Sequence, residues 1–390
     1  MSKEFDVLII GGGPAGAMTG IELCRKGYST CIIDKEIFPR PKLCGGLLTQ
    51  KSTDLLARYC PGLDPLEFVV EQAQTVDFYF QDKKVNRFTT REVYYFTERT
   101  IFDHLLVQYY LKLGGRMIQQ VALRPGDIDF GKNTVTAGTG KIYYKYLVGA
   151  DGCNGVLSRA AKIKRHDFLC LEACFPRDPH NEKEFRIYFG LANMGYGWYF
   201  PKKEHYCVGM GGEESGKAIS DKARRYFREA LNSQSAQVED FAVKGALLPS
   251  GRKLNTRRLP KNSLLVGDAA GFADPVTGEG IYYAMLSGVQ AAGAIDASAK
   301  NKKRNVLKRY NKSVWPIRKD IRAARFWKRI LYYPPILRAF MKHIQTHTNF
   351  VRFYLKKVIA TGEFNYRNFL RVYLKNRAFS PFAHDPDLTP

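Results

Sequence analysis

The sequence predicts a mixed α/β (α+β) fold, with a parallel α/β unit, a β-sheet domain and a helical C-terminal segment. Three observations lead to this prediction. The N-terminus reads as a buried strand, a glycine-rich turn and a helix; residues 196, 198 and 200 are aromatic, at the spacing of one face of a strand; and residues 317–331 repeat apolar side chains at helical spacing. A chain of 390 residues with 45% hydrophobic side chains can form more than one core.

The first motif is a nucleotide-binding signature. Residues 6–10 are almost entirely apolar, which is typical of a strand buried on both faces. Gly11, Gly13 and Gly16 follow in the pattern Gly-x-Gly-x-x-Gly, whose bare backbone lets a pyrophosphate approach a helix N-terminus. A second predicted strand ends at Asp34, 18 residues after Gly16, where a carboxylate can accept ribose hydroxyls. These features predict a Rossmann-like domain; the alternative is an ordinary glycine-rich turn.

Two later strands also end in aspartate. One ends at Asp151, and another ends at Gly267 and Asp268, before Gly278 and Gly280 open a helix. The Asp268 carboxylate can accept sugar hydroxyls, and the helix N-terminus near Gly280 places a positive dipole end beside a negatively charged ligand. Asp151 can instead cap a turn, and the residues alone leave both interpretations open.

With these motifs in this order, the chain resembles the FAD-dependent family that includes aromatic hydroxylases, flavin halogenases and geranylgeranyl reductases. The resemblance implies that the first glycines and Asp34 hold the ADP half of FAD, and that Asp268 bonds the ribityl chain. Arg99 matches an arginine of that family that contacts FAD at a helix start. The sequence has no second Gly-x-Gly-x-x-Gly motif for NAD(P)H.

A strand-like aromatic stretch favours the reductase branch of this family. Tyr196, Trp198, Phe200 and Pro201, followed by Gly-x-Gly at 209–211, match the geranylgeranyl reductase pattern. Alternation along a strand places the three rings on one face, where they can wall an apolar pocket. A core strand is the alternative interpretation. Halogenases carry two tryptophans before Ile-Pro in the related motif, and this chain does not.

Cys44 is the candidate catalytic thiol. It lies in FPRPKLCGGLLTQ, residues 38–50, and the Cys-Gly-Gly wording is characteristic of the reductases. Saturating a carbon–carbon double bond with hydride from a reduced flavin also requires a proton. A thiol, with an ordinary pKa of about 8.5, is mostly protonated at neutral pH and can supply it. Cys44 is therefore expected to be a proton donor or a substrate-positioning thiol, with core packing as the alternative.

The complete set of expected site residues follows from these motifs and the resemblance. The expected catalytic residues are Cys44, Tyr196 and Trp198, and the expected substrate-binding residues are Tyr196, Trp198, Phe200 and Pro201. The expected FAD-binding residues are Gly11, Gly13, Pro14, Ala15, Gly16, Asp34, Lys35, Cys44, Gly45, Gly46, Arg99, Val121, Asp151, Gly267, Asp268, Gly278, Gly280 and Ile281. No cluster of His and Cys predicts a metal site.

The domains are expected to be interleaved along the chain. The predicted ranges are 1–75, 95–165 and 250–300 for the FAD-binding domain, 76–94 and 166–249 for the substrate-binding β-sheet domain, and 301–390 for a basic helical segment.

The basic charge is concentrated near the C-terminus. Residues 300–377 contain 22 Lys and Arg against two acidic residues, a balance of +20 out of the net +24 of the whole chain. Three interpretations remain open: helices that pack on the body and close the substrate pocket, helices that in addition dock on an anionic membrane, and nucleic-acid binding. No recognised nucleic-acid motif accompanies the charge, so nucleic acid is not an expected partner.

These observations predict an enzyme that reduces double bonds of a prenyl lipid with FAD. NAD(P)H or a ferredoxin-type protein is the expected electron donor. Eight irregularly spaced cysteines suggest a reducing cytosol, and no window offers the roughly 20 uncharged apolar residues of a membrane span. The expected location is cytoplasmic, peripherally on the inner face of the membrane. The alternatives are an FAD monooxygenase acting on an apolar or aromatic substrate, and a non-catalytic membrane-associated flavoprotein.

Overall fold

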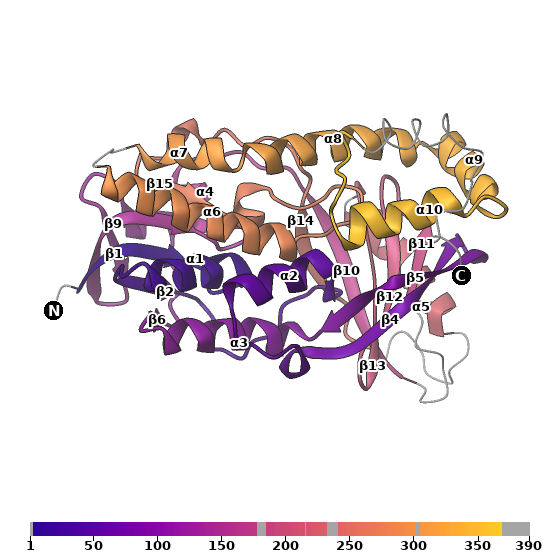
Figure 1. Cartoon of the computed structure of the whole chain (residues 1–390), viewed down its shortest axis with the longest axis horizontal. Coiled ribbons are helices and arrows are strands. Elements are labelled where there is room, and N and C mark those ends of the chain that lie inside the picture. The colour runs from indigo at the N-terminus through magenta and orange to yellow at the C-terminus, as the bar shows by residue number, and fades with distance from the viewer. Residues whose placement is uncertain (1–2, 178–184, 215, 232–240, 302–304, 369–390) are drawn as a thin grey trace.

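The computed structural model describes residues 3–177, 185–214, 216–231, 241–301 and 305–368. Within them, two β-sheets lie next to each other along the long axis of the molecule (Figure 1). Helices from the C-terminal part of the chain run along one side of both (Figure 1). The mixed α/β fold predicted from the sequence is confirmed.

The first sheet contains the N-terminal strand. Its order is β6-β2-β1-β9-β8-β7, with β15 paired to β9, and all pairs among β1, β2, β6, β9 and β15 are parallel. The strands are β1 (Lys3–Ile10), β2 (Thr30–Ile33), β6 (Arg116–Ile118), β7 (Ile128–Asp129), β8 (Thr134–Ala137), β9 (Gly140–Gly149) and β15 (Ser263–Leu265). Val7, Leu8 and Ile9 are fully buried, as expected for a strand covered on both faces.

Helices cover this parallel sheet. They are α1 (Pro14–Arg25), α2 (Gln50–Tyr59), α3 (Arg99–Lys112), α4 (Val156–Ala160), α6 (Ile281–Lys300) and α7 (Val306–Ser313). The α1 helix packs closely on α6, because Gly288 brings the α6 backbone against the carbonyl of Ala15. Short helical turns connect other elements: η1 (Pro65–Glu67), η2 (Pro125–Asp127), η4 (Thr256–Arg258) and η5 (Gly267–Ala270).

The second sheet is mostly antiparallel. Its order is β14-β10-β13-β12-β11-β4-β5-β3, and β11 with β4 is its one parallel pair among the described strands. The strands are β3 (Leu47–Leu48), β4 (Val69–Phe80), β5 (Lys83–Thr97), β10 (Asp167–Pro176), β11 (Phe185–Phe189), β12 (Tyr196–Pro201), β13 (His205–Gly212) and β14 (Lys244–Pro249). The β4–β5 hairpin is longer than the expected 76–94; the domain boundaries stay a prediction.

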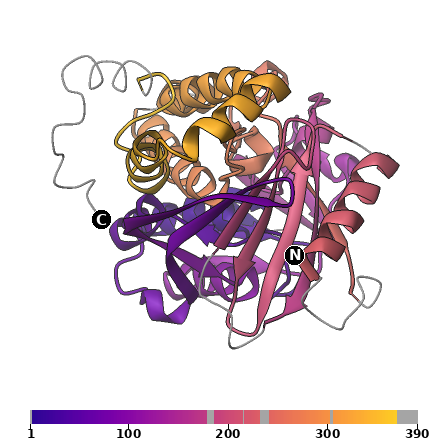
Figure 2. The ribbon, with the colours of Figure 1, turned by 90° about the vertical axis from the view of Figure 1, so that its right-hand side faces the viewer.

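Helices cover the two faces of the second sheet differently. Figure 2 shows α5 (Gly216–Leu231) on one side and the C-terminal helices on the other. Phe175, Tyr199 and Phe227 belong to the core under α5, whereas Trp198 and Phe200 belong to the core on the opposite face.

The C-terminal segment packs on the body of the protein through an apolar stripe. Its helices are α8 (Trp315–Leu331), α9 (Pro334–Ile344), α10 (Asn349–Tyr354) and the π-helical η6 (Leu355–Ala360). Ile317, Ile321 and Ala324 of α8 are buried, in agreement with the helical spacing seen in the sequence. Residues 369–390, the last part of the predicted basic segment, lie outside the described residues.

Replacement by alanine is expected to change stability in opposite directions at two glycines of α6. A Cβ atom at Gly288 would lie 2.5 Å from the carbonyl oxygen of Ala15, whereas a Cβ at Gly293 would meet nothing within 4 Å. We expect Gly288→Ala to destabilise the protein by about 1–3 kcal/mol, because α1 and α6 must separate. Gly293→Ala should stabilise it by about 0.5–1 kcal/mol through helix propensity. Thermal melts of both variants test this, and equal shifts in Tm would contradict the close packing of α1 on α6.

Candidate active site

A cavity of about 1120 Å³ lies where the two sheets and the C-terminal helices meet. It brings together most of the residues predicted from the sequence. Its walls contain Gly11, Gly13, Pro14, Ala15, Asp34, Lys35, Cys44, Gly45, Gly46, Arg99, Val121, Asp151, Tyr196, Trp198, Phe200, Asp268, Gly278, Gly280 and Ile281. Gly16, Gly267 and Pro201 do not line it.

The glycine-rich turn forms one end of the cavity. Gly11 has φ +102°, and a Cβ there would lie 2.5 Å from the carbonyl oxygen of Ala150 at the end of β9. At Gly16, which does not line the cavity, a Cβ would overlap the carbonyl oxygen of Gly11. The turn is therefore closed by backbone packing, and it leaves the N-terminus of α1 open to the cavity.

Asp34 is held at the end of β2 beside this turn. Its carboxylate accepts the N–H of Gly12 at 2.7 Å and that of Glu36 at 3.0 Å, and the residue is 8% exposed. Both oxygens retain lone pairs for further donors. A ligand with two neighbouring hydroxyls can therefore bind here, as predicted for an adenosine ribose.

Asp151 caps a turn and also lines the cavity. Its Oδ2 accepts the N–H of Val156 at 2.5 Å, so the side chain does cap the turn before α4. Its buried Oδ1 has no hydrogen-bond partner within the described residues, although the residue faces the cavity. Burial raises the pKa of Asp151 to about 6, against the opposing effect of main-chain N–H groups. Oδ1 lies against Gly155, where a Cβ would be 2.3 Å away, so the turn requires glycine at that position.

Asp268 follows β15 and lies against the N-terminus of α6. A Cβ at Gly280, the residue preceding α6, would be 3.4 Å from its Oδ1. Burial raises the pKa of Asp268, and Lys42, Arg99 and Arg165 oppose that shift. Arg165 also donates to the carbonyl oxygen of Asp268 at 2.7 Å, which fixes the turn. The sequence indicated Lys42, with Arg40, only as positive charge close to Cys44, and it did not indicate Arg165, because both residues act on Asp268 across the fold.

Arg99 is the charged centre of the cavity wall. It donates Nε and Nη2 to the Asp103 carboxylate, both at 2.7 Å, and Arg40 pairs with the same fully buried carboxylate at 3.1 Å. Burial lowers the pKa of Arg99, but Asp103 and then Cys44 more than offset it, so the pKa is raised. The sequence had indicated Arg99 but not Asp103, which lies one helical turn later in α3 and could have been found as an i,i+4 pair.

Cys44 lies in the loop before β3, close to Arg99. The N–H of Gly46 points to its sulfur at 3.4 Å. A Cβ at Gly45 would lie 2.7 Å from the ring of Phe200, so the loop is packed against the aromatic strand. Other cysteines are more ordinary: burial raises the pKa of Cys31 and of Cys60 to about 12, as expected for packing residues.

The aromatic strand β12 forms the opposite wall. Tyr196 and Trp198 pack edge to face with ring centroids 6.1 Å apart, and Tyr196 donates its hydroxyl to the carbonyl oxygen of Thr277. Gly209 on β13 has no room for a Cβ, because the Trp198 ring occupies that space. Pro201 is buried at the end of the strand and does not reach the cavity.

The C-terminal helices complete the apolar end of the cavity. Tyr332, Tyr354, Leu355 and Ile359 line it together with aromatic residues of the second sheet. Sequence analysis did not assign these residues to the site, because the segment was recognised by its charge, which lies on the other side of the helices.

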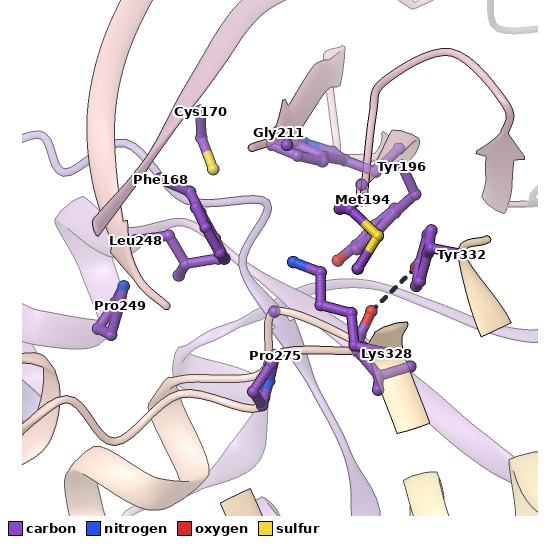
Figure 3. Close-up of a pocket in the computed structure, with 15 residues that line it drawn as sticks. Phe168, Cys170, Met194, Tyr196, Gly211, Leu248, Pro249, Pro275, Lys328 and Tyr332 are labelled. Carbon is purple, nitrogen blue, oxygen red and sulfur yellow. Dashed lines mark hydrogen bonds between the residues drawn. The ribbon is translucent and has the colours of Figure 1, made fainter. Parts of the chain in front are cut away.

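A smaller pocket of about 30 Å³ lies behind the aromatic wall (Figure 3). Figure 3 shows Lys328 of α8 reaching into it between Tyr196 and Phe168. The residue is 4% exposed, and its ammonium lies 4.1 Å from the Phe168 ring centroid. Within the described residues it makes no hydrogen bond or ion pair. Burial lowers the pKa of Lys328 to about 8, against the weaker effects of Glu213 and Cys170.

Comparisons with known proteins agree with this geometry. Residues 4–60 match the family described as FAD binding domain. An uncharacterized protein of Methanosarcina barkeri is 30% identical over 307 residues, which are 77% of this chain and 76% of that protein. Digeranylgeranylglycerophospholipid reductase 2 of Methanosphaera stadtmanae is 28% identical over 316 residues, 76% of this chain and 78% of the relative.

The fold is similar to that of a geranylgeranyl bacteriochlorophyll reductase-like protein from Thermoplasma acidophilum, with a TM-score of 0.75. The two are 20% identical, and the match covers 89% of this chain and 93% of the other. Fold and site together define an FAD-dependent oxidoreductase. The chain belongs to the geranylgeranyl reductase family of these enzymes.

The residues of the cavity fit FAD. The bare turn at Gly11 and Gly13 offers main-chain N–H groups to a pyrophosphate, and Asp34 can accept ribose hydroxyls. Asp151 and Asp268 lie farther along the same cavity. The individual contacts of these side chains with FAD stay predictions.

The lowered pKa of Lys328 predicts that the folding stability of the protein depends on pH. The unfolded chain keeps this proton up to about pH 10.5, while the folded protein releases it near pH 8, so the site lowers stability at neutral pH by about 3 kcal/mol. This cost disappears as the pH rises from about 8 to 10.5. We expect Lys328→Met to be more stable than the unmodified protein at pH 7, with a difference that shrinks toward pH 10.

Thermal melts of both proteins across this pH range measure the difference. Lys319→Met, on the partly exposed side of the same helix, is the matched control and should follow the unmodified protein. A Lys328→Met difference that does not vary with pH would contradict the assigned cause.

Proposed function

We propose that this protein reduces carbon–carbon double bonds of an isoprenoid lipid. The observation that carries the proposal is the continuity of one cavity from the glycine-rich turn, past Cys44, to an apolar end lined by Phe78, Phe185, Phe189, Leu355 and Ile359. Such a wall suits a long hydrocarbon chain and offers it few polar contacts. The names of relatives, among them digeranylgeranylglycerophospholipid reductase, support a prenyl substrate.

A residue of the chain itself is proposed to donate the proton that the reduction requires. Reduced FAD, when bound, supplies the hydride. The Cys44 thiol gives its proton to the carbon that does not receive hydride. The N–H of Gly46 points to Sγ at 3.4 Å and helps to hold the sulfur in place. Tyr196 and Trp198 exclude water from this part of the cavity, because their rings are packed and largely buried.

Replacement of Cys44 tests the proton transfer. Cys44→Ser and Cys44→Ala should lower turnover by about 100-fold or more in protein that retains FAD, as expected when a general acid is removed. Turnover is measured by mass spectrometry of the lipid, which gains two hydrogens per reduced bond. Cys174→Ser, at an exposed cysteine, is the control and should behave as unmodified protein.

Unchanged turnover in the FAD-loaded Cys44 variants would exclude the proton-donor role. The reaction should also proceed without O₂. A requirement for O₂ would favour an FAD monooxygenase and contradict the reductase proposal.

The outer face of α8 is proposed to dock on an anionic membrane. Trp315 and Phe326 are 44% and 61% exposed, and Lys319, Arg322 and Arg329 share their helical stripe. Tyr333 and Ile336, at the start of α9, are 55% and 41% exposed and extend the apolar surface. Basic and aromatic side chains on one helix face suit a lipid interface, to which each Lys or Arg contributes about 1 kcal/mol. No helix of the described residues is long and apolar enough to cross a membrane.

Vesicle flotation tests this surface. The unmodified protein should float with vesicles that contain anionic lipid and bind neutral vesicles much less. Arg322→Glu with Arg329→Glu should abolish the preference, whereas Lys132→Glu with Lys141→Glu, the same charge change on the exposed β7–β9 region, should not. Binding that ignores lipid charge, or no binding at all, would refute electrostatic docking.

A further inference from the structure

Lys202 is a buried lysine with an unusual set of partners. It follows Pro201 at the end of β12, and it is 2% exposed. Its ammonium donates to the carbonyl oxygens of Gly45 and Thr97, both at 2.7 Å. Within the described residues it pairs with no carboxylate. A charge buried at this depth must be compensated, and here main-chain carbonyls provide the compensation.

The two carbonyls belong to segments that carry the active site. Gly45 adjoins Cys44, and Thr97 ends β5, two residues before Arg99. The N–H of Thr97 also donates to the carbonyl oxygen of Gly46 at 2.8 Å. One ammonium therefore links the Cys-Gly-Gly loop, the segment that leads into Arg99, and the end of the aromatic strand.

The Cys-Gly-Gly loop packs closely against the ammonium of Lys202. Gly46 has φ +67°, and a Cβ there would lie 2.6 Å from Nζ of Lys202 and would overlap the carbonyl oxygen of Thr97. No side chain fits at this position without moving the loop or the lysine. The path of the loop therefore depends on the ammonium as well as on the glycine conformation.

Glu172 of β10 approaches the same loop. Burial raises its pKa, and the Cys207 thiol, Lys202, Trp198 and the N–H of Cys44 oppose that shift by favouring the charged form. The backbone of the loop therefore meets Lys202 at the carbonyl of Gly45, and the buried Glu172 lies near the same loop.

We propose that Lys202 is a positioning residue, whose bonds to the carbonyl oxygens of Gly45 and Thr97 hold the Cys44 thiol beside Arg99 at the cavity wall. Its effect on catalysis rests on the proposed proton transfer from Cys44. Its effect on the thiol can be measured separately, without any substrate.

The measurement is the alkylation rate of Cys44 by iodoacetamide between pH 6 and 9 in the FAD-loaded protein, read by peptide mass spectrometry. The ionisable groups around the thiol are Arg99 of α3, Glu172 and Cys170 of β10, Tyr196 and Lys202 at the two ends of β12, and Lys42 of its own loop. Free glutathione alkylated in the same mixture serves as the standard, because Lys202 also acts on the pKa of Cys174.

In Lys202→Met, alkylation of Cys44 at neutral pH should change by about tenfold and its dependence on pH should change, because the loop no longer holds the thiol in place at the cavity wall. Lys202→Arg should restore part of the rate. With prenyl substrate, kcat should fall by about tenfold while KM changes little, since the cavity wall remains.

Two further variants test whether the effect of Lys202 comes from the position of the loop. One controls for the loss of a positive charge, and the other for misfolding of Lys202→Met. Lys42→Met removes a cation of the same loop whose ammonium makes no hydrogen bond within the part of the chain that the structure describes, and it should shift the Cys44 profile much less than Lys202→Met. Gly46→Ala displaces the loop with Lys202 intact and should reproduce the Lys202→Met profile, which gives an answer even if Lys202→Met does not fold.

An unchanged Cys44 profile in Lys202→Met or Gly46→Ala overturns the proposal, as does an equal shift in Lys42→Met. The alkylation result does not depend on whether the protein reduces a prenyl lipid. If FAD-loaded Cys44→Ala turns over normally, the proton-donor role fails, while the alkylation rates still decide whether Lys202 positions the thiol.

Discussion

The close approach of α1 to its neighbours is the constraint on which the site depends. A Cβ at Gly16 would overlap the carbonyl of Gly11, and one at Gly288 would press on the carbonyl of Ala15. Because Gly16 and Gly288 have no side chains, α1 can begin next to the ends of β1 and β9 and can pack against α6. Because parallel strands end at the same edge of a sheet, this packing also brings Asp34, Asp151 and Asp268 to one cavity.

The second constraint is a set of buried charges that join the two sheets. Asp103 holds Arg99 and Arg40, and Lys202 holds the carbonyls of Gly45 and Thr97. Buried ions of this kind contribute little net stability, because desolvation opposes their attraction, but each one tolerates very few arrangements of its partners. They therefore fix the geometry of the cavity wall more than they strengthen the fold.

The C-terminal segment has two faces with different roles in the structure. Its apolar side closes the cavity through Tyr332, Tyr354 and Leu355, while its basic residues lie mostly on the outside. The same helices thus shape the apolar end of the cavity and present a charged surface. A lipid entering from a membrane would meet both, which connects the proposed docking with the proposed substrate.

The sequence by itself determined the nucleotide-binding strand, turn and helix, the acid at Asp34, the aromatic strand at Tyr196 and Trp198, and the family, because these signals lie in short, regularly spaced segments. It could not give the partners of Arg40, Asp103, Arg165 or Lys202, nor say which residues of the C-terminal helices line the cavity. Those contacts join residues far apart in the chain or depend on which way a helix faces. Only the tertiary structure decides them, because the partner of a buried charge is set by packing and not by spacing.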